Sequence, residues 1–206
     1  DNQCLGTGLL GLVRDGWPFV NTLHHPITVD RDLDLAAASG PWRRMTLRRW
    51  YGFLRMQMRV ARQIPRHLTV SGNSKKDIIA QSGVDPETLH VVSVGVDQQQ
   101  FRPLPQVARV PGRLMTTASA DVPLKGLTSL IEALAKVRTE REDAHLVVIG
   151  QPRHKSAVPA QLERLGLTDA VEFVSGVTDE RIVELYAEAE IAVVPSLYEG
   201  FSLPAI

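Results

Sequence analysis

The strongest constraint on the fold is a regular alternation of short apolar runs with amphipathic helical patterns. Apolar runs bounded by turn residues predict strands at Pro18–Leu23, His67–Val70, Leu89–Val94, Arg113–Thr117, Leu146–Ile149, Val171–Val174 and Ile191–Val194. Apolar residues at three- and four-residue spacing predict helices at Leu5–Asp15, Trp42–Ile64, Lys75–Gln81, Leu127–Arg141, Pro159–Leu165 and Asp179–Glu188. Such alternation is typical of parallel sheets covered by helices on both faces, so the predicted fold class is α/β.

The alternation breaks once, between Asp97 and Arg113. This segment holds three glutamines in a row and prolines at 103, 105 and 111, without a periodic apolar face. It therefore predicts a linker, and we divide the chain into domains 1–104 and 105–206. Each half is short for a doubly wound domain of five or six strands, so we expect both to be incomplete and the chain to be an internal segment of a longer protein.

Charge and cysteine content narrow the class of protein. The chain has 23 basic and 23 acidic residues, so no net charge draws it toward nucleic acid. Its one cysteine, Cys4, cannot form an internal disulfide, which fits a reducing compartment. No apolar run approaches the roughly 20 residues of a membrane span. We expect a cytoplasmic protein without a nucleic-acid partner.

The segment 195–206 follows the last predicted strand and contains a glycine turn. Open α/β sheets bind ligands outside the carboxyl ends of their strands, which would place Glu199 at a ligand-facing edge. The backbone N–H groups of Gly200, Phe201 and Ser202 could meet an anion there. A solvated turn glutamate is the alternative, and position alone leaves both interpretations open.

Lys125 ends another strand-to-helix loop, beside Gly126. Its ammonium could meet a phosphate held at the helix start, whereas a merely solvated lysine is the alternative. The loop is not a P-loop, because it lacks that motif's glycine spacing and Lys-Ser/Thr pair. Gly150, after the strand Leu146–Ile149, adds a third turn at the same edge. Together these turns favour a ligand with a diphosphate and several hydroxyls.

In the first half, His24 and His25 directly follow a predicted strand. An imidazole there could donate to a sugar or phosphate oxygen or move a proton, or one ring could merely satisfy a turn carbonyl before Pro26. We predict no metal site, because adjacent histidines point apart and no Cys/His cluster accompanies them. The glycine pair Gly6 and Gly8 is only a weak signal for phosphate binding.

The stretch Trp42–Arg66 contains eight arginines interleaved with aromatic and apolar residues. A basic amphipathic helix of this kind can rest on an anionic lipid surface, which would add a peripheral contact with the inner face of a membrane. A core helix with a solvated arginine face produces the same pattern and is the favoured alternative. RNA binding is disfavoured, because the zero net charge offers no second basic patch.

Two groups of motifs resemble the family 4 glycosyltransferases of GT-B fold. The end of that family's N-terminal domain is similar to Val70-Ser71 before a polar-capped helix, Val91–Asp97 and Phe101–Pro103. Its donor domain is similar in order and spacing to Leu124–Gly126, Leu130–Leu134, Leu146–Gly150 and Pro195–Pro204. The resemblance covers nearly the whole chain and implies two Rossmann-like parallel-sheet domains, each incomplete here.

The resemblance implies a retaining transferase that moves a sugar from a nucleotide diphosphate sugar to an acceptor, which could be a glycan, a lipid or a small molecule. No metal or other cofactor is implied. Lys125 would stabilise the diphosphate as its charge grows, Glu199 would hold sugar hydroxyls, and His24 rather than His25 would contact the sugar near the reacting centre. The donor would also be bound by Gly150, Gly200, Phe201, Ser202 and Leu203.

Three departures from the family pattern matter, and one is the absence of the glycine-rich first loop of the N-terminal domain. Residues 119–121 occupy the place of a basic residue that normally precedes the lysine, and the family's second glutamate would fall just past Ile206. We therefore expect this chain alone to be inactive or nearly so. A non-catalytic nucleotide- or sugar-binding module of the same fold stays open as an alternative. A phosphorylase or synthase is a third reading, without a visible Schiff-base lysine to favour a phosphorylase.

Overall fold

The computed structural model describes residues 3, 5–118, 122–152 and 156–206. The chain separates into two compact units, each considered by itself. The first comprises Asp1–Gly95 with Glu199–Phe201, and the second comprises Val96–Tyr198 with Ser202–Ile206. Residues 96–104, which the sequence analysis assigned to the first domain, lie in the second unit. The functional domain boundary at 104 and 105 stays a prediction.

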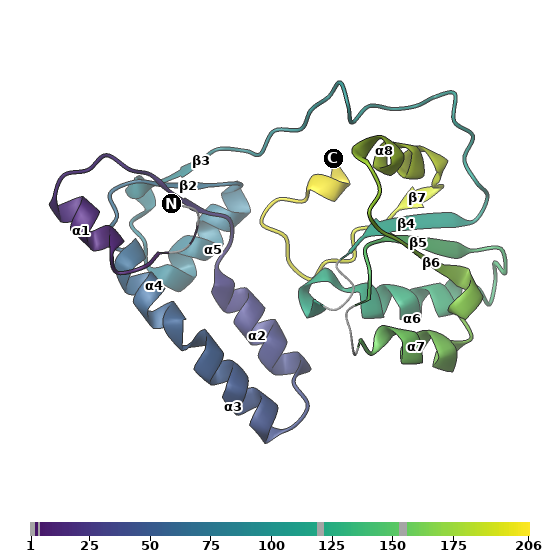
Figure 1. The fold of residues 1–206 in the computed structure, drawn as a ribbon, viewed down its shortest axis with the longest axis horizontal. Coiled ribbons are helices and arrows are strands. Elements are labelled where there is room, and N and C mark those ends of the chain that lie inside the picture. The colour runs from purple at the N-terminus through teal and green to yellow at the C-terminus, as the bar shows by residue number, and fades with distance from the viewer. Residues whose placement is uncertain (1–2, 4, 119–121, 153–155) are drawn as a thin grey trace. The chain divides into compact units, whose positions relative to one another are not determined.

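The first unit contains a three-stranded parallel sheet in the order β1-β2-β3 (Figure 1). Its strands are β1 (Asn21–Leu23), β2 (His67–Thr69) and β3 (Leu89–Val91). Asn21 pairs with His67, and His67 in turn pairs with Leu89. The helices are α1 (Leu9–Arg14), α2 (Ile27–Ala37), α3 (Pro41–Trp50), α4 (Leu54–Ala61) and α5 (Gly72–Ser82), with short 3-10 turns at η1 (Tyr51–Phe53) and η2 (Pro86–Thr88).

Two helical features of this unit differ from the sequence prediction. The helix α2 was not predicted, because its first turn is rich in β-branched residues and its apolar positions form only a weak stripe. The predicted helix Trp42–Ile64 is divided by the 3-10 turn at Tyr51–Phe53, which contains Gly52. Only Leu47 of α3 is buried, whereas α4 buries several residues in the core: Leu54, Gln57, Val60 and Ala61. The core-helix interpretation is thus right for α4 and wrong for α3.

The helix α5 shows how local chemistry fixes an element boundary. Its N-cap is Ser71, whose hydroxyl accepts a hydrogen bond from the Ser74 N–H at 3.0 Å. Gly83 ends the helix in the left-handed conformation, with φ of 68°. The cap thereby places two serine hydroxyls at the start of α5.

The second unit is a four-stranded parallel sheet in the order β6-β5-β4-β7. Its strands are β4 (Arg113–Thr117), β5 (His145–Ile149), β6 (Val171–Val174) and β7 (Ile191–Ala192). The helices are α6 (Leu127–Val137), α7 (Val158–Leu165) and α8 (Asp179–Glu188), with 3-10 turns at η3 (Pro123–Lys125), η4 (Thr168–Ala170) and η5 (Leu203–Ala205). Figure 1 shows α6 and α7 on one face of this sheet and α8 on the other.

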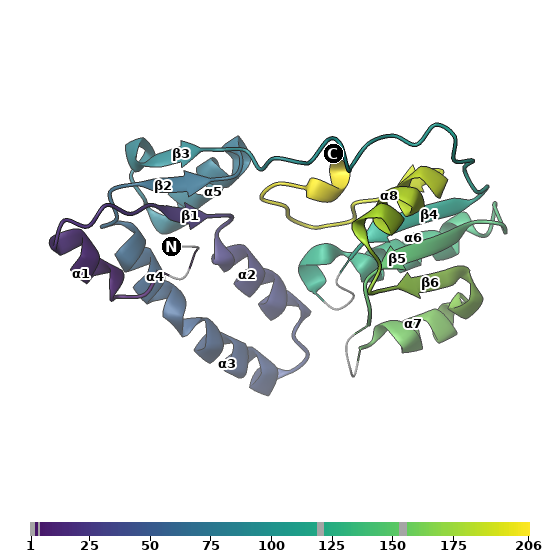
Figure 2. The same ribbon diagram turned by 45° about the horizontal axis from the view of Figure 1, so that its top comes forward.

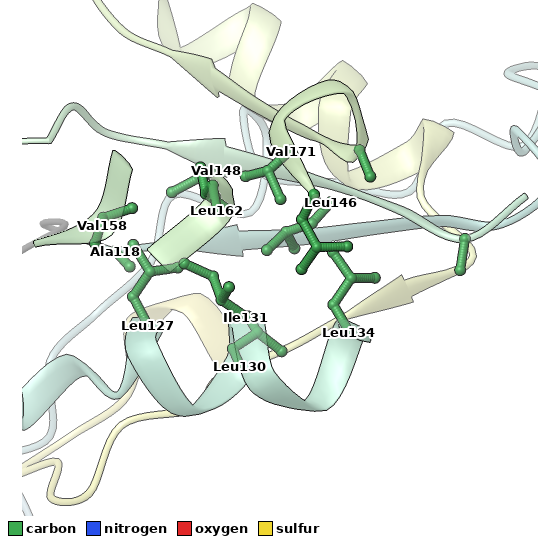
Figure 3. Packing of buried hydrophobic residues seen from close by; sticks show 13 residues of the cluster. Ala118, Leu127, Leu130, Ile131, Leu134, Leu146, Val148, Val158, Leu162 and Val171 are labelled. Carbon is green, nitrogen blue, oxygen red and sulfur yellow. The ribbon is translucent and has the colours of Figure 1, made fainter. Parts of the chain in front are cut away.

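Alternating strand residues fill the two faces of this sheet. On the side of α6 and α7, Leu146 and Val148 pack with Leu127, Ile131 and other buried residues (Figure 3). On the side of α8, Met115 and Val147 pack with Leu185 and Ala189. Both faces of this sheet are thus covered, as is usual for parallel sheets, and the predicted α/β class with two parallel sheets is confirmed.

Candidate functional site

The Lys125 turn lies beside the chain that leaves β7. The N–H of Leu197 donates to the carbonyl oxygen of Leu124 at 2.8 Å. Gly126, with φ of 65°, ends η3, and a Cβ at this position would overlap the carbonyl oxygen of Pro195. Glycine is therefore required both by the backbone conformation and by the close approach of residues 195–197. The second unit thus brings the predicted lysine turn against the segment that leads into Glu199.

Gly150 lies at the carboxyl end of β5, as the sequence predicts. Its N–H donates to the carbonyl oxygen of Val174 at 2.8 Å, which extends the pairing of β5 with β6 by one residue. Gly150 is half-buried and has φ of 148°. The turn after β4 includes residues 119–121, where the sequence lacks the expected basic residue, and these lie outside the described residues.

Ser202, Leu203 and the residues after them form the end of the second unit. The Tyr186 hydroxyl of α8 donates to the carbonyl oxygen of Pro204 at 3.1 Å, which holds η5 against that helix. The hydroxyl oxygen of Ser202 is buried and has no hydrogen-bond partner among the described residues. Leaving such an atom unpaired costs about 1–3 kcal/mol, which a bound ligand group could offset. Leu203 is exposed.

Residues 199–201 pack in the first unit, although the chain on both sides of them belongs to the second. The carbonyl oxygen of Gly200 accepts hydrogen bonds from two hydroxyls, Ser71 Oγ at 2.6 Å and Ser74 Oγ at 3.1 Å. A Cβ on Gly200 would lie 2.6 Å from the carbonyl oxygen of His24. The turn that carries Glu199 and Phe201 is therefore held by the N-terminus of α5 and by the end of β1.

His24 follows β1 directly and its side chain is exposed. Its backbone N–H donates to Gln3 Oε1 at 2.9 Å, and the carbonyl oxygen of His25 accepts from Gln3 Nε2 at the same distance. Gln3 therefore fixes the backbone on both sides of the His24 side chain. The structure brings His24 to the turn at Gly200 within the first unit.

His25 has a different environment from His24. Its Nε2 lies 2.7 Å from Asp30 Oδ2, and both side chains are about three-quarters covered. This contact joins the end of β1 to α2 and gives His25 a structural partner. The preference for His24 over His25 as the residue near the sugar is compatible with this arrangement, and it stays a prediction.

Gln3, Ser71 and Ser74 shape this region, although none of them was among the site residues predicted from the sequence. Ser71 and Ser74 could have been predicted from the sequence, because parallel sheets bind ligands where a strand ends and a polar helix start follows. Gln3 could not have been predicted, since its hydrogen-bond partners are backbone atoms more than twenty residues away along the chain. The described residues contain no cluster of three or more side chains suited to a metal ion.

A cavity of about 780 Å³ lies in the second unit, and Leu203 of the predicted donor-binding set is among its lining residues. It is lined by residues of the segment 96–109, by α8 and by residues 203–206, and Lys125 is not among them. Its walls combine apolar side chains with Arg102 and Arg109. In the part of the chain that the structure describes, no helix is long and apolar enough to cross a membrane.

Similar proteins support the resemblance seen in the motifs. The family model described as glycosyl transferases group 1 matches residues 106–206. An MMP alpha-(1->4)-mannosyltransferase of Mycolicibacterium hassiacum is 50% identical over 206 residues, which is 100% of this chain and 49% of that protein. A D-inositol 3-phosphate glycosyltransferase of Catenulispora acidiphila is 31% identical over 97% of this chain and 48% of its own length. The chain thus spans about half the length of these curated relatives.

Solved structures show the same fold. HepE of Anabaena in complex with UDP-glucose superposes with a TM-score of 0.68 and 20% identity, covering 95% of this chain and 52% of that one. Sucrose-phosphate synthase of Thermosynechococcus elongatus superposes with a TM-score of 0.67 and 19% identity, covering 95% and 49%. The chain therefore belongs to the glycosyl transferases group 1 family, the family 4 glycosyltransferases of GT-B fold whose motifs it carries.

Proposed function

We propose that the protein containing this chain transfers a mannosyl residue from a nucleotide diphosphate mannose to an acceptor, with retention and with formation of an α-(1→4) linkage. The sugar and the linkage are inferred from the name of the relative that is 50% identical along the whole chain. The observation that carries the proposal is the packing of the Lys125 turn against the residues that lead into Glu199. Within the second unit, this packing holds the Lys125 turn beside residues 195–197, at the end of a parallel sheet where ligands bind.

Lys125 would bind the donor diphosphate. When the glycosidic bond breaks, its electron pair moves to the leaving phosphate oxygen, and an ammonium already in place stabilises the charge that develops there. The helix α6 starts directly after Gly126. The N–H groups of its first turn carry partial positive charge and would also attract a phosphate. Lys125 is half-buried, which strengthens its attraction for a phosphate relative to a fully solvated lysine.

Glu199 would accept hydrogen bonds from hydroxyls of the transferred sugar. Its turn is fixed by the two serine hydroxyls that donate to the carbonyl oxygen of Gly200, so the carboxylate needs little reorganisation on binding. The N–H groups of Phe201 and Ser202 follow the same turn and would face the donor. Gly150 and Leu203 complete the donor-side set predicted from the sequence.

His24 would donate a hydrogen bond near the anomeric carbon. The acceptor hydroxyl attacks on the face that the leaving group occupies, and the departing phosphate oxygen takes the hydroxyl proton, so that the α configuration is kept. Because no carboxylate forms a covalent bond in this scheme, the side chains act by positioning and by charge stabilisation. The fixed backbone at His24 and Gln3 supports such a positioning role.

The test uses the whole protein with nucleotide diphosphate mannose and measures donor binding by calorimetry and transfer by release of the nucleoside diphosphate. Lys125→Gln is expected to lower kcat by about a hundredfold to a thousandfold, as loss of one preorganised donor does. Glu199→Gln and His24→Asn should each lower kcat/KM by roughly tenfold to a hundredfold. Each variant should keep the unfolding temperature of the parent.

Matched controls make the same exchanges at exposed positions away from these turns: Lys136→Gln, Glu163→Gln and His90→Asn. They should leave turnover unchanged. If Lys125→Gln turned over as fast as Lys136→Gln, the assignment of Lys125 to the diphosphate would be wrong. If the whole protein bound the donor but neither hydrolysed nor transferred it, the non-catalytic binding module would replace the proposed transferase.

A further inference from the structure

The helix α3 exposes large apolar side chains together with its arginines. Trp42 is 76% exposed, Trp50 is 69% exposed and Met45 is 53% exposed. Leu47 is the single residue of this ten-residue helix that the first unit buries. Tryptophan is usually well covered in folded proteins, so two exposed ones on a short helix form an unusual surface.

The spacing of these residues gives α3 one outward face. Trp42, Met45 and Arg49 stand at positions i, i+3 and i+7, which lie above one another on a helix. Leu47 projects from the opposite side toward the first unit, and Arg48 borders the outward face. Trp50 flanks the row on its other side and is exposed. The outward face, defined as Trp42, Met45 and Arg49 with the flanking Arg48 and Trp50, therefore mixes apolar and cationic side chains.

The charge around this face has a single sign. No Asp or Glu occurs between Asp34 and Asp77, whereas that interval contains eight arginines and two lysines. The four arginines of α3 form no ion pair within the described ranges: Arg43, Arg44, Arg48 and Arg49. They therefore give α3 an uncompensated positive charge on a chain whose total charge is zero.

The neighbouring helix α2 does not neutralise this charge. It runs side by side with α3, as Figure 1 and Figure 2 both show. Its three carboxylates have other partners, because Asp30 contacts His25, Asp32 pairs with Arg31, and Asp34 accepts from the Tyr51 hydroxyl at 2.7 Å. The Tyr51 bond also fixes the end of α3 to α2, so the face is presented by an anchored helix.

We propose that the outward face of α3 docks the protein on an anionic lipid bilayer. Arginines near an anionic leaflet are attracted to its headgroups, and tryptophans are favoured at the boundary between headgroups and acyl chains. A soluble polyanion would satisfy the arginines but would leave Trp42 and Met45 in water. None of the residues of this surface has a role in the proposed sugar transfer. The two proposals can therefore be tested independently.

The test is co-sedimentation of the whole protein with vesicles of equal parts phosphatidylglycerol and phosphatidylcholine, compared with vesicles of phosphatidylcholine alone. We expect binding to the anionic vesicles only, and weaker binding as salt rises. The double variant Arg48→Gln/Arg49→Gln should lower the partition coefficient by about thirtyfold, on the order of fivefold for each cation. Trp42→Ala/Trp50→Ala should lower it by about tenfold.

The matched control is Lys136→Gln/Arg164→Gln, which removes the same charge from exposed positions on α6 and α7. It should change the partition coefficient by less than about twofold. All variants should keep the parent's unfolding temperature and its turnover of a soluble acceptor, which separates this proposal from the proposed transfer reaction.

Several outcomes would overturn lipid docking. The idea fails if anionic vesicles do not sediment the protein, or if the control variant loses as much binding as Arg48→Gln/Arg49→Gln. Binding that is insensitive to Trp42→Ala/Trp50→Ala would indicate a site for soluble polyanions. A change in oligomeric mass caused by the same tryptophan variant without lipid would indicate that a second copy covers this face.

Discussion

The two units share one plan, a parallel sheet with helices packed on it, yet they differ in how much helical surface the sheet buries. In the second unit, α6 and α7 contribute to a cluster of thirteen buried residues, and α8 covers the other face. The principal cluster of the first unit has eight buried residues, and α3 adds one residue outside it. Residues 1–95 carry 12 basic and 8 acidic residues, whereas residues 96–206 carry 11 and 15. The first unit thus carries a basic helix that contributes little to its core.

The largest expected effect is a loss of stability when a buried isoleucine is truncated in either core, and it tests whether the larger core of the second unit tolerates a void less well. Ile131 in α6 and Ile78 in α5 are both buried, with 0% and 2% of their surface exposed. Truncation to Ala should lower the free energy of unfolding by about 2–5 kcal/mol, and Ile131→Ala should cost more because its larger cluster collapses less readily around the void. Urea unfolding of the whole protein measures both. A larger loss for Ile78→Ala would reverse the comparison.

A smaller effect concerns the close approach at Gly126. Gly126 and Gly166 both have φ of 65°, but only Gly126 has a neighbour that an added Cβ would overlap. Both substitutions to Ala carry a left-handed backbone penalty of about 1–2 kcal/mol. Gly126→Ala should cost about 1–3 kcal/mol more, because the Pro195 carbonyl must move.

The same two glycine variants should also differ in enzymatic activity. Gly126→Ala should reduce sugar transfer, since it shifts the segment that leads into Glu199, whereas Gly166→Ala should leave turnover unchanged. Equal unfolding temperatures for the two variants would show that the contact between Gly126 and Pro195 adds nothing to stability.

The smallest effect is a pH dependence that belongs to the first unit. His67 is fully buried in β2, where its Nε2–H donates to the carbonyl oxygen of Ala61 at 2.9 Å and its Nδ1 accepts from Asn21 Nδ2 at 3.1 Å. Burial lowers the pKa of His67 despite the hydrogen bond to Ala61. The neutral ring is therefore the form that fits the folded chain.

The sign of the pH dependence follows from that lowered pKa. The unfolded chain binds a proton near the ordinary histidine value of about 6.5, while the folded chain binds it only at lower pH. Stability is therefore complete above about pH 6.5 and falls as the pH is lowered, by at most about 1.4 kcal/mol per pH unit. Unfolding experiments at stepped pH should show this slope reduced in His67→Gln and retained in the exposed control His90→Gln. An unchanged slope in His67→Gln would assign the pH dependence to other groups.

Much of the fold was predictable because it depends on local patterns. The second unit's strands and helices follow the predicted ranges closely, since apolar periodicity and turn residues such as Gly150 and Gly166 act over a few residues. The first unit was less predictable. Its helix α2 lacks a strong apolar stripe, and the division between α3 and α4 depends on how each helix packs rather than on the composition of either.

The sequence by itself determined the α/β class, the family and the residue types at the strand ends, because motifs and periodicity are properties of neighbouring residues. Only the tertiary structure decided that Ser71 and Ser74 hold the carbonyl of Gly200, that Gln3 clamps the backbone at His24, and that α3 stays outside the core. These features join positions far apart in the chain, and which surfaces are buried is settled only when the elements pack together. The spacing of residues along the chain does not predict such contacts.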